Sequence, residues 1–299
     1  DAIYVAIGAH TDKKLGLEGE DSKNVISAVD MLREIGDGAY PDYTGKRVVV
    51  VGGGNVAMDC ARTAMRANAE TVSIVYRRRQ EDMTALPAEV EGAIAEGIEL
   101  VTLKAPLRVE ADAEGNACAL WVQPQIIGPV KGGRPSPRKA NKPEERMECD
   151  IVLVAIGQDI VSGPFADFGM AVNRGRIAAD KGGAANMVGV YAGGDCVSGP
   201  ATVIKAIAAG KAAAANIDEY LGYHHPISCD VEIPEPMLND KVPCGRVNLQ
   251  EVEAWARKTN FEGIELPMSC EEAVQEASRC LRCDRHGCGT LRGGREFEW

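Results

Sequence analysis

The sequence predicts an α/β fold of three layers, supported by its composition, its element pattern and an internal repeat. Hydrophobic residues make up 45% of the 299 residues but aromatic residues only 5%, so the core must consist of aliphatic side chains and small residues. Such a core allows helices to lie close on parallel strands. Short apolar runs alternate with helical patterns along much of the chain, which is typical of βαβ units.

The internal repeat places nearly the same apolar run at two positions. Residues 1–8 are Asp-Ala-Ile-Tyr-Val-Ala-Ile-Gly, and residues 150–157 are Asp-Ile-Val-Leu-Val-Ala-Ile-Gly. Both runs predict a buried strand, and the repeat predicts two related nucleotide-binding units. Because Asp1 leads directly into the first strand, we expect the chain to be a fragment of a longer protein.

The other elements follow from local patterns. Apolar runs and helical spacing predict a helix at 25–35, a linker at 36–45, strands at 46–51 and 72–76, a helix at 87–96 and a strand at 98–103. Residues 107–127 have the pattern of antiparallel strands, with a hairpin turn at 114–116. The polar stretch at 128–146 is rich in Lys and Arg; we interpret it as a solvated hairpin tip, with a docking surface for an acidic partner as the alternative.

Charge and hydropathy exclude several classes of partner. The net charge of −11 argues against non-specific binding to nucleic acid or to anionic membranes. No apolar run approaches the roughly 18 residues of a membrane span, and no signal peptide is visible. We therefore expect a cytoplasmic protein with neither nucleic-acid nor membrane partners.

A glycine-rich turn follows the strand at 46–51. Its six residues, Gly-Gly-Gly-Asn-Val-Ala, fit the pattern G-x-G-x-x-A between a strand and a helix. Gly52 permits the tight turn, Gly54 lets the backbone approach a pyrophosphate, and Ala57 allows close packing of helix on strand. The helix N-terminus at Asn55 and Val56 supplies N–H donors and a positive dipole. The turn therefore predicts a Rossmann-type dinucleotide site.

The end of the next strand distinguishes NADPH from NADH. A site that prefers NAD places Asp or Glu there, about 20 residues beyond the turn, to bind the ribose 2′-hydroxyl. Here the strand ends in Tyr76-Arg77-Arg78-Arg79. Because guanidinium groups form bidentate, charge-assisted bonds to phosphate, we predict that Arg77 and Arg78 bind the 2′-phosphate of NADPH. A solvated basic strand end is the alternative.

A second nucleotide signal lies near residue 195. A short apolar run ends in Gly194 and Asp195, and a new alanine-rich helix starts at Ala201, Thr202 and Val203. A carboxylate at a strand end beside a helix N-terminus can bind a polyol chain and an electron-rich ring edge together.

Taken with the phosphate turn, this signal resembles the small (β) subunit of NADPH-dependent glutamate synthase. That subunit is one of the FAD-dependent pyridine-nucleotide oxidoreductases, which have two dinucleotide-binding domains. The resemblance covers residues 1 to about 225 in the family's order, and its stretches are Ala6–Ala9, Gly52–Arg62, Tyr76–Ala88, Ala155–Gly157 and Gly189–Ala215. It implies a tandem Rossmann-like, three-layer ββα fold of the FAD/NAD(P)-linked reductases.

The resemblance also implies roles for residues of the second signal. Asp195, after Gly194, would bind the ribityl or ribose hydroxyls of FAD. The helix start at 201–203 would face the pyrimidine edge of the flavin. Gly157, at the end of the repeated run, is counted with the cofactor-binding residues. Hydride would pass from NADPH to the flavin while the protein orients the two rings, so no residue is nominated as a catalytic acid or base.

The same resemblance implies a division into domains. Residues 1–44 are assigned to part of the FAD domain and a linker, 45–157 to the NADPH domain, 158–225 to the C-terminal part of the FAD domain, and 226–299 to an extended linker and a cysteine-rich tail. The family's own FAD fingerprint, a strand, GxGxxG and a helix, does not occur in the sequence. We expect that segment to precede Asp1, which leaves the FAD domain incomplete.

The tail contains a candidate metal site. Cys280, Cys283 and Cys288 form the pattern C-x2-C-x4-C, and Cys270 or Cys244 can provide a fourth thiolate. The resemblance implies an iron–sulfur cluster that takes electrons onward. Structural zinc and free thiols are the alternatives.

The predicted function is electron transfer by a flavoprotein oxidoreductase. It would oxidise NADPH, or reduce NADP⁺, through FAD and an iron–sulfur centre toward a redox partner subunit. One alternative is a disulfide reductase resembling thioredoxin reductase, with Cys280 and Cys283 as its redox dithiol. Another is a non-catalytic, NADPH-binding adaptor of a redox complex.

Overall fold

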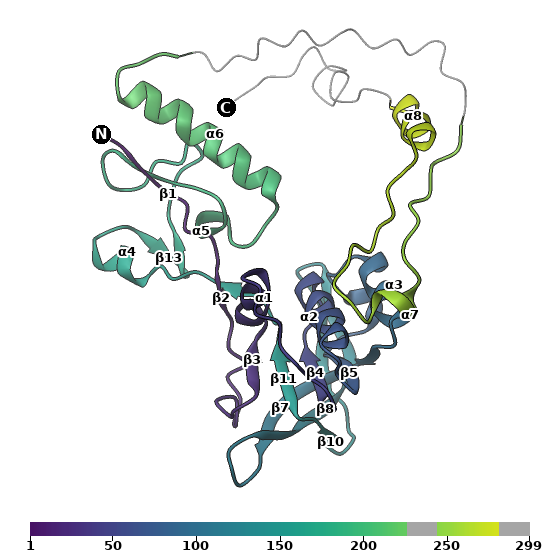
Figure 1. The fold of residues 1–299 in the computed structure, drawn as a ribbon. Coiled ribbons are helices and arrows are strands. Elements are labelled where there is room, and N and C mark those ends of the chain that lie inside the picture. The colour runs from purple at the N-terminus through teal and green to yellow at the C-terminus, as the bar shows by residue number, and fades with distance from the viewer. Residues whose placement is uncertain (226–243, 281–299) are drawn as a thin grey trace. The chain divides into compact units, whose positions relative to one another are not determined.

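The computed structural model describes residues 1–225 and 244–280 (Figure 1). The chain divides into two compact units. The larger unit contains residues 9–161 and 253–262, and the described residues of the smaller unit are 1–8, 162–225, 244–252 and 263–280. Residues 9–44, which the family resemblance places in the FAD domain and a linker, lie in the larger unit and contribute a strand to its sheet.

A five-stranded parallel sheet forms the middle layer of the larger unit. Its strand order is β3, β11, β4, β5, β6, and every neighbouring pair is parallel. The strands are β3 (Val25–Ser27), β11 (Ile151–Val154), β4 (Arg47–Val51), β5 (Thr71–Tyr76) and β6 (Glu99–Thr102).

Helices cover one face of this sheet and an antiparallel sheet covers the other. Val48 and Val50 of β4 pack with α1 (Ala28–Gly36), α2 (Asn55–Arg66) and α3 (Pro87–Ala95). Val49 and Val51 pack against the antiparallel sheet, because successive side chains of a strand point to opposite faces. Both faces of β4 are therefore buried, and the predicted three-layer α/β fold is confirmed.

The antiparallel layer consists of four strands. They are β7 (Lys104–Ala111), β8 (Ala117–Lys131), β9 (Arg134–Lys139) and β10 (Glu145–Glu148), and β8 pairs with all three others. The predicted turn at 114–116 joins β7 to β8, where the amide of Asp112 donates to the Asn116 carbonyl at 2.8 Å. The polar stretch at 128–146 forms a second hairpin and strand β10. A pair of two-residue strands, β2 (Thr11–Asp12) and β12 (Gln158–Asp159), completes the strands of this unit.

The predicted helix at 25–35 needs a correction at its start. Residues 25–27 form β3, and α1 begins at Ala28. Two local causes explain the boundary. Val25 and Ile26 pair with β11 in the parallel sheet, and the Ser27 hydroxyl accepts a hydrogen bond from the Asp30 amide at 3.3 Å, which caps the helix.

Residues 253–262 return from the C-terminal part of the chain to the larger unit. This segment contains α7 (Ala254–Arg257). Arg257 Nε donates at 2.8 Å to the carboxylate of Glu96, which is fully buried at the end of α3. Phe261 packs against Tyr40 with ring centroids 4.7 Å apart. Two distant parts of the sequence are therefore joined at one side of the helical layer.

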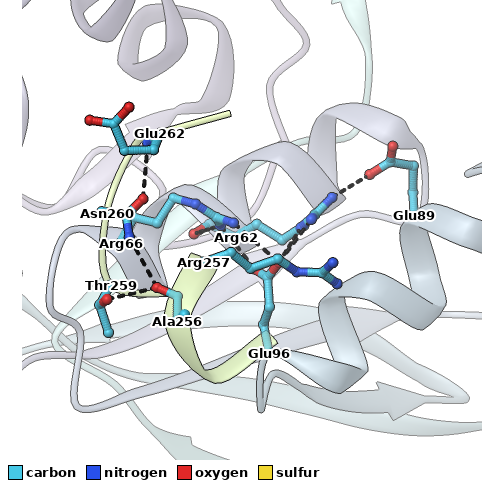
Figure 2. Close-up of polar contacts among 9 residues, drawn as sticks. All are labelled: Arg62, Arg66, Glu89, Glu96, Ala256, Arg257, Thr259, Asn260 and Glu262. Atoms are coloured by element: carbon cyan, nitrogen blue, oxygen red, sulfur yellow. Dashed lines mark hydrogen bonds and ion pairs between the residues drawn. The ribbon is translucent and has the colours of Figure 1, made fainter. Parts of the chain in front are cut away.

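Glu96 also receives two arginines of α2, and these four residues are here called the Glu96 cluster (Figure 2). Arg62 Nη2 donates to Glu96 at 2.8 Å, and Arg66 Nη1 donates at 2.9 Å. Burial acts to raise the pKa of Glu96, but the hydrogen bonds and charges of Arg62 and Arg66 outweigh it and hold the pKa below its ordinary value. The carboxylate is thus held charged in the interior.

The smaller unit contains the other copy of the repeat. β1 (Ile3–Val5) pairs in parallel with β15 (Val190–Ala192). Its remaining described elements are α4 (Gly163–Asp167), β13 (Val172–Asn173), β14 (Arg176–Ile177), α5 (Asp195–Ser198), α6 (Val203–Tyr220) and α8 (Cys270–Ser278). Among the described residues of the whole chain, no helix is long and apolar enough to cross a membrane.

Candidate dinucleotide site

The glycine turn lies at the carboxyl end of β4, where two glycines are required by close packing. A β-carbon on Gly52 would lie 2.3 Å from the carbonyl oxygen of Ala155, and one on Gly53 would lie 2.4 Å from the ring of Tyr76. A β-carbon on Gly54 would meet protein only at 3.4 Å, an ordinary contact. The protein's own packing therefore does not require glycine at 54, and its bare backbone leaves space in front of the helix.

Helix α2 begins directly at this turn. Within the described residues the amides of Asn55 and Val56 donate no hydrogen bond, and the first turn of the helix contains no acidic residue. Ala57 is fully buried, as its predicted role in helix packing requires. Unpaired amides at a helix N-terminus bind anions through hydrogen bonds and the helix dipole.

A loop after β5 closes over the turn. The amides of Thr84 and Ala85 donate to the Gly53 carbonyl at 2.9 and 3.2 Å. The amide of Leu86 donates to Asn55 Oδ1 at 2.9 Å. The Asn55 side chain therefore orients this loop, while its backbone amide stays available. The 3₁₀ helix η1 (Gln80–Asp82) precedes the loop.

The three consecutive arginines after β5 have different partners. Arg79 donates to the carboxylate of Asp82 at 2.9 Å and lies 3.9 Å from that of Glu81. Arg77 is exposed and has no hydrogen-bond or ion-pair partner among the described residues. Arg78 Nε donates to the Pro135 carbonyl at 2.8 Å. It forms no ion pair among the described residues, although its charge helps to lower the pKa of Asp82. Of the three arginines, the two predicted to bind phosphate are thus the two without an ion-pair partner in this part of the chain.

Sequence reasoning missed the contact between Gly53 and Tyr76. Tyr76 ends β5 and its ring lies against the turn, while its hydroxyl donates to the Asp82 carbonyl at 2.8 Å. Gly53 occupies an unspecified position of the G-x-G-x-x-A pattern. A third glycine at that position was the available signal that a bulky side chain packs there.

Gly157 lies near the same edge of the sheet. It follows β11, the neighbour of β4, and parallel strands end at a common edge. Its φ of 126° favours glycine, and its carbonyl accepts a hydrogen bond from the Lys13 amide at 3.1 Å. The topology thus brings the end of the second repeat copy to the turn at 52–57.

In the smaller unit, the residues of the second nucleotide signal organise a helix start. Gly194 has a φ of 73° and precedes α5. Asp195 Oδ1 accepts a hydrogen bond from the Ala201 amide at 3.1 Å. Thr202 caps α6 by accepting from the Lys205 amide at 3.4 Å. Val203, the first residue of α6, is 75% exposed.

The structure describes two of the four predicted metal ligands, Cys270 and Cys280, while Cys283 and Cys288 lie outside the described residues. No group of three or more potential ligands with metal-binding geometry occurs in the part of the chain that is described. Cys270 begins α8 and Cys280 follows its end, so a rise of about 1.5 Å per residue separates them by about 15 Å. By contrast, Cys244 Sγ lies 3.6 Å from Ser278 Oγ, two residues before Cys280.

Two of the thiols in the layers of the larger unit are core residues. Cys60, on the inward face of α2, and Cys149, before β11, are both fully buried. Burial raises the pKa of each thiol to about 12. A thiol with so high a pKa is a poor nucleophile near neutral pH, so neither residue has the character of a redox cysteine.

Comparison with known families and proteins shows which oxidoreductases this chain is similar to. The family model described as pyridine nucleotide-disulphide oxidoreductase matches residues 1–210. The β subunit of NADP⁺-dependent formate dehydrogenase from Moorella thermoacetica is 37% identical over 98% of this chain and 44% of its own length. The β subunit of NADPH-Fe(3+) oxidoreductase from Geobacter sulfurreducens is 34% identical over 95% of this chain and 48% of its own length. The chain thus spans less than half the length of either relative.

The predicted resemblance to the glutamate synthase small subunit is confirmed. The small chain of NADPH glutamate synthase from Escherichia coli is 32% identical over 74% of this chain and 50% of its own length. Among solved structures, FprA from Mycobacterium tuberculosis in complex with NADPH aligns with a TM-score of 0.60 at 20% identity, over 74% of this chain and 64% of that one. Thioredoxin reductase from Lactococcus lactis aligns with a TM-score of 0.57 at 21% identity, over 74% of this chain and 66% of that one. At these identities the two structures support the fold alone.

Proposed function

The chain belongs to the pyridine nucleotide-disulphide oxidoreductase family, and on that premise we propose that it transfers electrons between NADP(H) and FAD, and through an iron–sulfur centre to a partner subunit. One observation supports the proposal most strongly. The turn at 52–57 presents unpaired helix amides, and Arg77 and Arg78, at the end of the next strand, form no ion pair among the described residues. This combination fits a dinucleotide with an extra phosphate.

The residues present fit NADPH at each phosphate. The amides of Asn55 and Val56 would bind the pyrophosphate, and the bare backbone at Gly54 would allow it to approach. Arg77 and Arg78 would bind the 2′-phosphate through charge-assisted hydrogen bonds. The described strand end presents no unpaired carboxylate to bind a ribose 2′-hydroxyl instead, because Glu81 and Asp82 both lie within ion-pair distance of Arg79.

The smaller unit fits part of a flavin site. Asp195 keeps one carboxylate oxygen available beyond its bond to Ala201, which suits a polyol chain. Val203 and Ile204, at the start of α6, are 75% and 78% exposed. A flat apolar ring packed against them would remove part of this apolar surface from water. When bound, FAD would provide the acceptor for a hydride from the nicotinamide. The chain's own residues would bind and orient the two cofactors, with no side chain required as an acid or base.

The names of the relatives support transfer to a partner. Two of them are β subunits and another is a small chain, so each works within a larger enzyme. For this chain, the cysteine-rich tail would provide the onward route. Cys280, Cys283 and Cys288 would bind the cluster, and Cys244 is better placed than Cys270 to be the fourth ligand, because it contacts the end of α8.

The visible spectrum before and after anaerobic addition of NADPH tests the proposal, together with iron and acid-labile sulfide analysis. We expect bleaching of a flavin band and of a broad cluster absorbance, with both iron and sulfide present. NADPH-dependent disulfide reduction without iron would contradict the proposal in favour of a dithiol reductase. Absence of flavin, iron and diaphorase activity would contradict it in favour of a binding adaptor.

A further inference from the structure

The β8–β9 hairpin brings a third arginine to the strand end where Arg77 and Arg78 lie. Arg134 is the first residue of β9 and is partly buried. Its Nη2 donates to the Tyr76 hydroxyl at 2.7 Å and also to the Asp82 carbonyl. The next residue of the hairpin, Pro135, accepts the bond from Arg78. Two adjacent residues of the hairpin are thus attached to the end of β5.

The arginines of the larger unit divide by whether a carboxylate compensates them. Within this unit, whose backbone is described throughout, eight arginines form ion pairs with Asp or Glu: 33, 47, 62, 66, 79, 108, 146 and 257. The four that form none are 77, 78, 134 and 138. All four lie either at the end of β5 or on the hairpin attached to it.

An uncompensated guanidinium in a partly buried position indicates an anion site. Charge removed from water is costly unless it is paired, and eight arginines of the unit have carboxylate partners. Only the Nη2 group of Arg134 is engaged among the described residues, so its Nε and Nη1 donors remain available. Each of those groups can donate a charge-assisted hydrogen bond to a phosphate oxygen.

Tyr76 connects this arginine to the phosphate turn. Its ring lies against Gly53 and its hydroxyl accepts the bond from Arg134. Tyr76 is 8% exposed, so the ring is held in place by its surroundings. One side chain therefore sets the position of the hairpin guanidinium relative to the turn.

We propose that Arg134 is a further residue of the NADPH site, which binds the 2′-phosphate together with Arg77 and Arg78. The hairpin then determines the preference for NADPH over NADH, in place of the solvated tip that the sequence predicts. This inference rests on the proposed function, because it specifies which residues read the phosphate of the same nucleotide.

The test compares the dissociation constants of NADP⁺ and NAD⁺ by calorimetry on the full chain. We expect Arg134→Gln to weaken NADP⁺ binding on the order of tenfold or more, the usual effect of losing a charged hydrogen bond, and to leave NAD⁺ binding unchanged. Arg134→Lys keeps the charge but replaces the planar guanidinium and its separate N–H groups with a single ammonium, so we expect an intermediate loss. The matched control is Lys139→Gln on the same strand, with the same change of charge and no expected effect.

Three outcomes would overturn the role of Arg134 alone: an unchanged NADP⁺ to NAD⁺ ratio in Arg134→Gln, an equal loss for both nucleotides, or the same loss in Lys139→Gln. If Arg134→Gln does not fold, Arg134→Lys decides, and an unchanged ratio there contradicts the proposal. Failure of the NADPH assignment is distinct, because the unaltered chain would then show no preference for NADP⁺ over NAD⁺. Failure of electron transfer is distinct as well, because flavin and iron would be absent while the effect of Arg134→Gln on the ratio persists.

Discussion

The larger unit contains two groups of arginines that differ in their surroundings. In the Glu96 cluster, three guanidiniums share one fully buried carboxylate, and one of them comes from residues 253–262 (Figure 2). In the second group, here called the strand-end cluster, Arg77 and Arg78 follow β5 and Arg134 is bonded to its last residue, and none of the three forms an ion pair among the described residues. The residue type is the same, but only the first group is ion-paired with a carboxylate.

The difference separates a structural use of arginine from a binding use. A buried carboxylate with several guanidiniums holds distant segments together, and loss of one partner leaves an uncompensated charge. Guanidiniums without a carboxylate keep their charge and part of their hydrogen-bonding capacity for a ligand. Substitutions in the first cluster should therefore change stability, and substitutions in the second should change nucleotide affinity.

The largest effect is expected at the shared carboxylate. Glu96→Gln keeps the size of the side chain but removes its charge, so we expect the free energy of unfolding to fall by about 3 kcal/mol or more. A shift in the urea unfolding midpoint measures it. Glu89→Gln is the control, because Glu89 is more exposed and bonds to Arg62 alone among the cluster; its cost should stay below about 1 kcal/mol. Equal stability of the two variants would contradict the structural role.

Substitutions in the strand-end cluster should change the affinity for the nucleotide. We expect Arg77→Ala combined with Arg78→Ala to lower the NADP⁺ to NAD⁺ affinity ratio on the order of a hundredfold, because two charge-assisted bonds to phosphate are lost. Titration calorimetry measures the ratio. The control is Arg79→Ala in the same run, whose charge Asp82 already compensates. An unchanged ratio in the double variant would remove the NADPH assignment.

A smaller effect is expected at the third guanidinium of the Glu96 cluster. Arg257→Gln leaves Arg62 and Arg66 on the carboxylate, so we expect a loss of about 1–2 kcal/mol and local release of residues 253–262. Faster chymotryptic cleavage after Phe261 would report that release. Arg279→Gln, in a surface ion pair with Glu276, is the control. If both variants are cleaved at the same rate, Arg257 does not hold the segment.

The smallest effect is a difference in pH dependence. The folded-state pKa of Glu96 is lowered, so its contribution is fully present above the unfolded pKa and is lost as the pH falls through the folded value. We expect the unaltered protein to lose stability below about pH 4.5. In Glu96→Gln, the part of this pH-dependent loss of stability that comes from Glu96 should be absent. Unfolding free energies between pH 3 and pH 7 would show parallel curves if Glu96 contributes nothing.

Local patterns were sufficient for much of the fold and of the site. The turn at 52–57 and the arginines after Tyr76 were predictable because each lies in one short stretch between a strand and a helix. The start of α1 was not, since residues 25–27 take a strand conformation only through pairing with β11, more than a hundred residues away. Periodicity in a short apolar run does not distinguish these states.

The sequence by itself determined the candidate chemistry of this protein: a glycine turn of the dinucleotide-binding pattern, basic residues where a 2′-phosphate is proposed to bind, and a cysteine-rich tail. Only the tertiary structure decided which charges are used for the fold and which stay available. Arg62 and Arg66 bond to Glu96 across 34 and 30 residues, and Arg257 bonds to it across 161 residues. Arg134 joins the strand end across 58 residues. Whether two charges pair depends on their distance in space, and that distance cannot be calculated from their spacing along the chain.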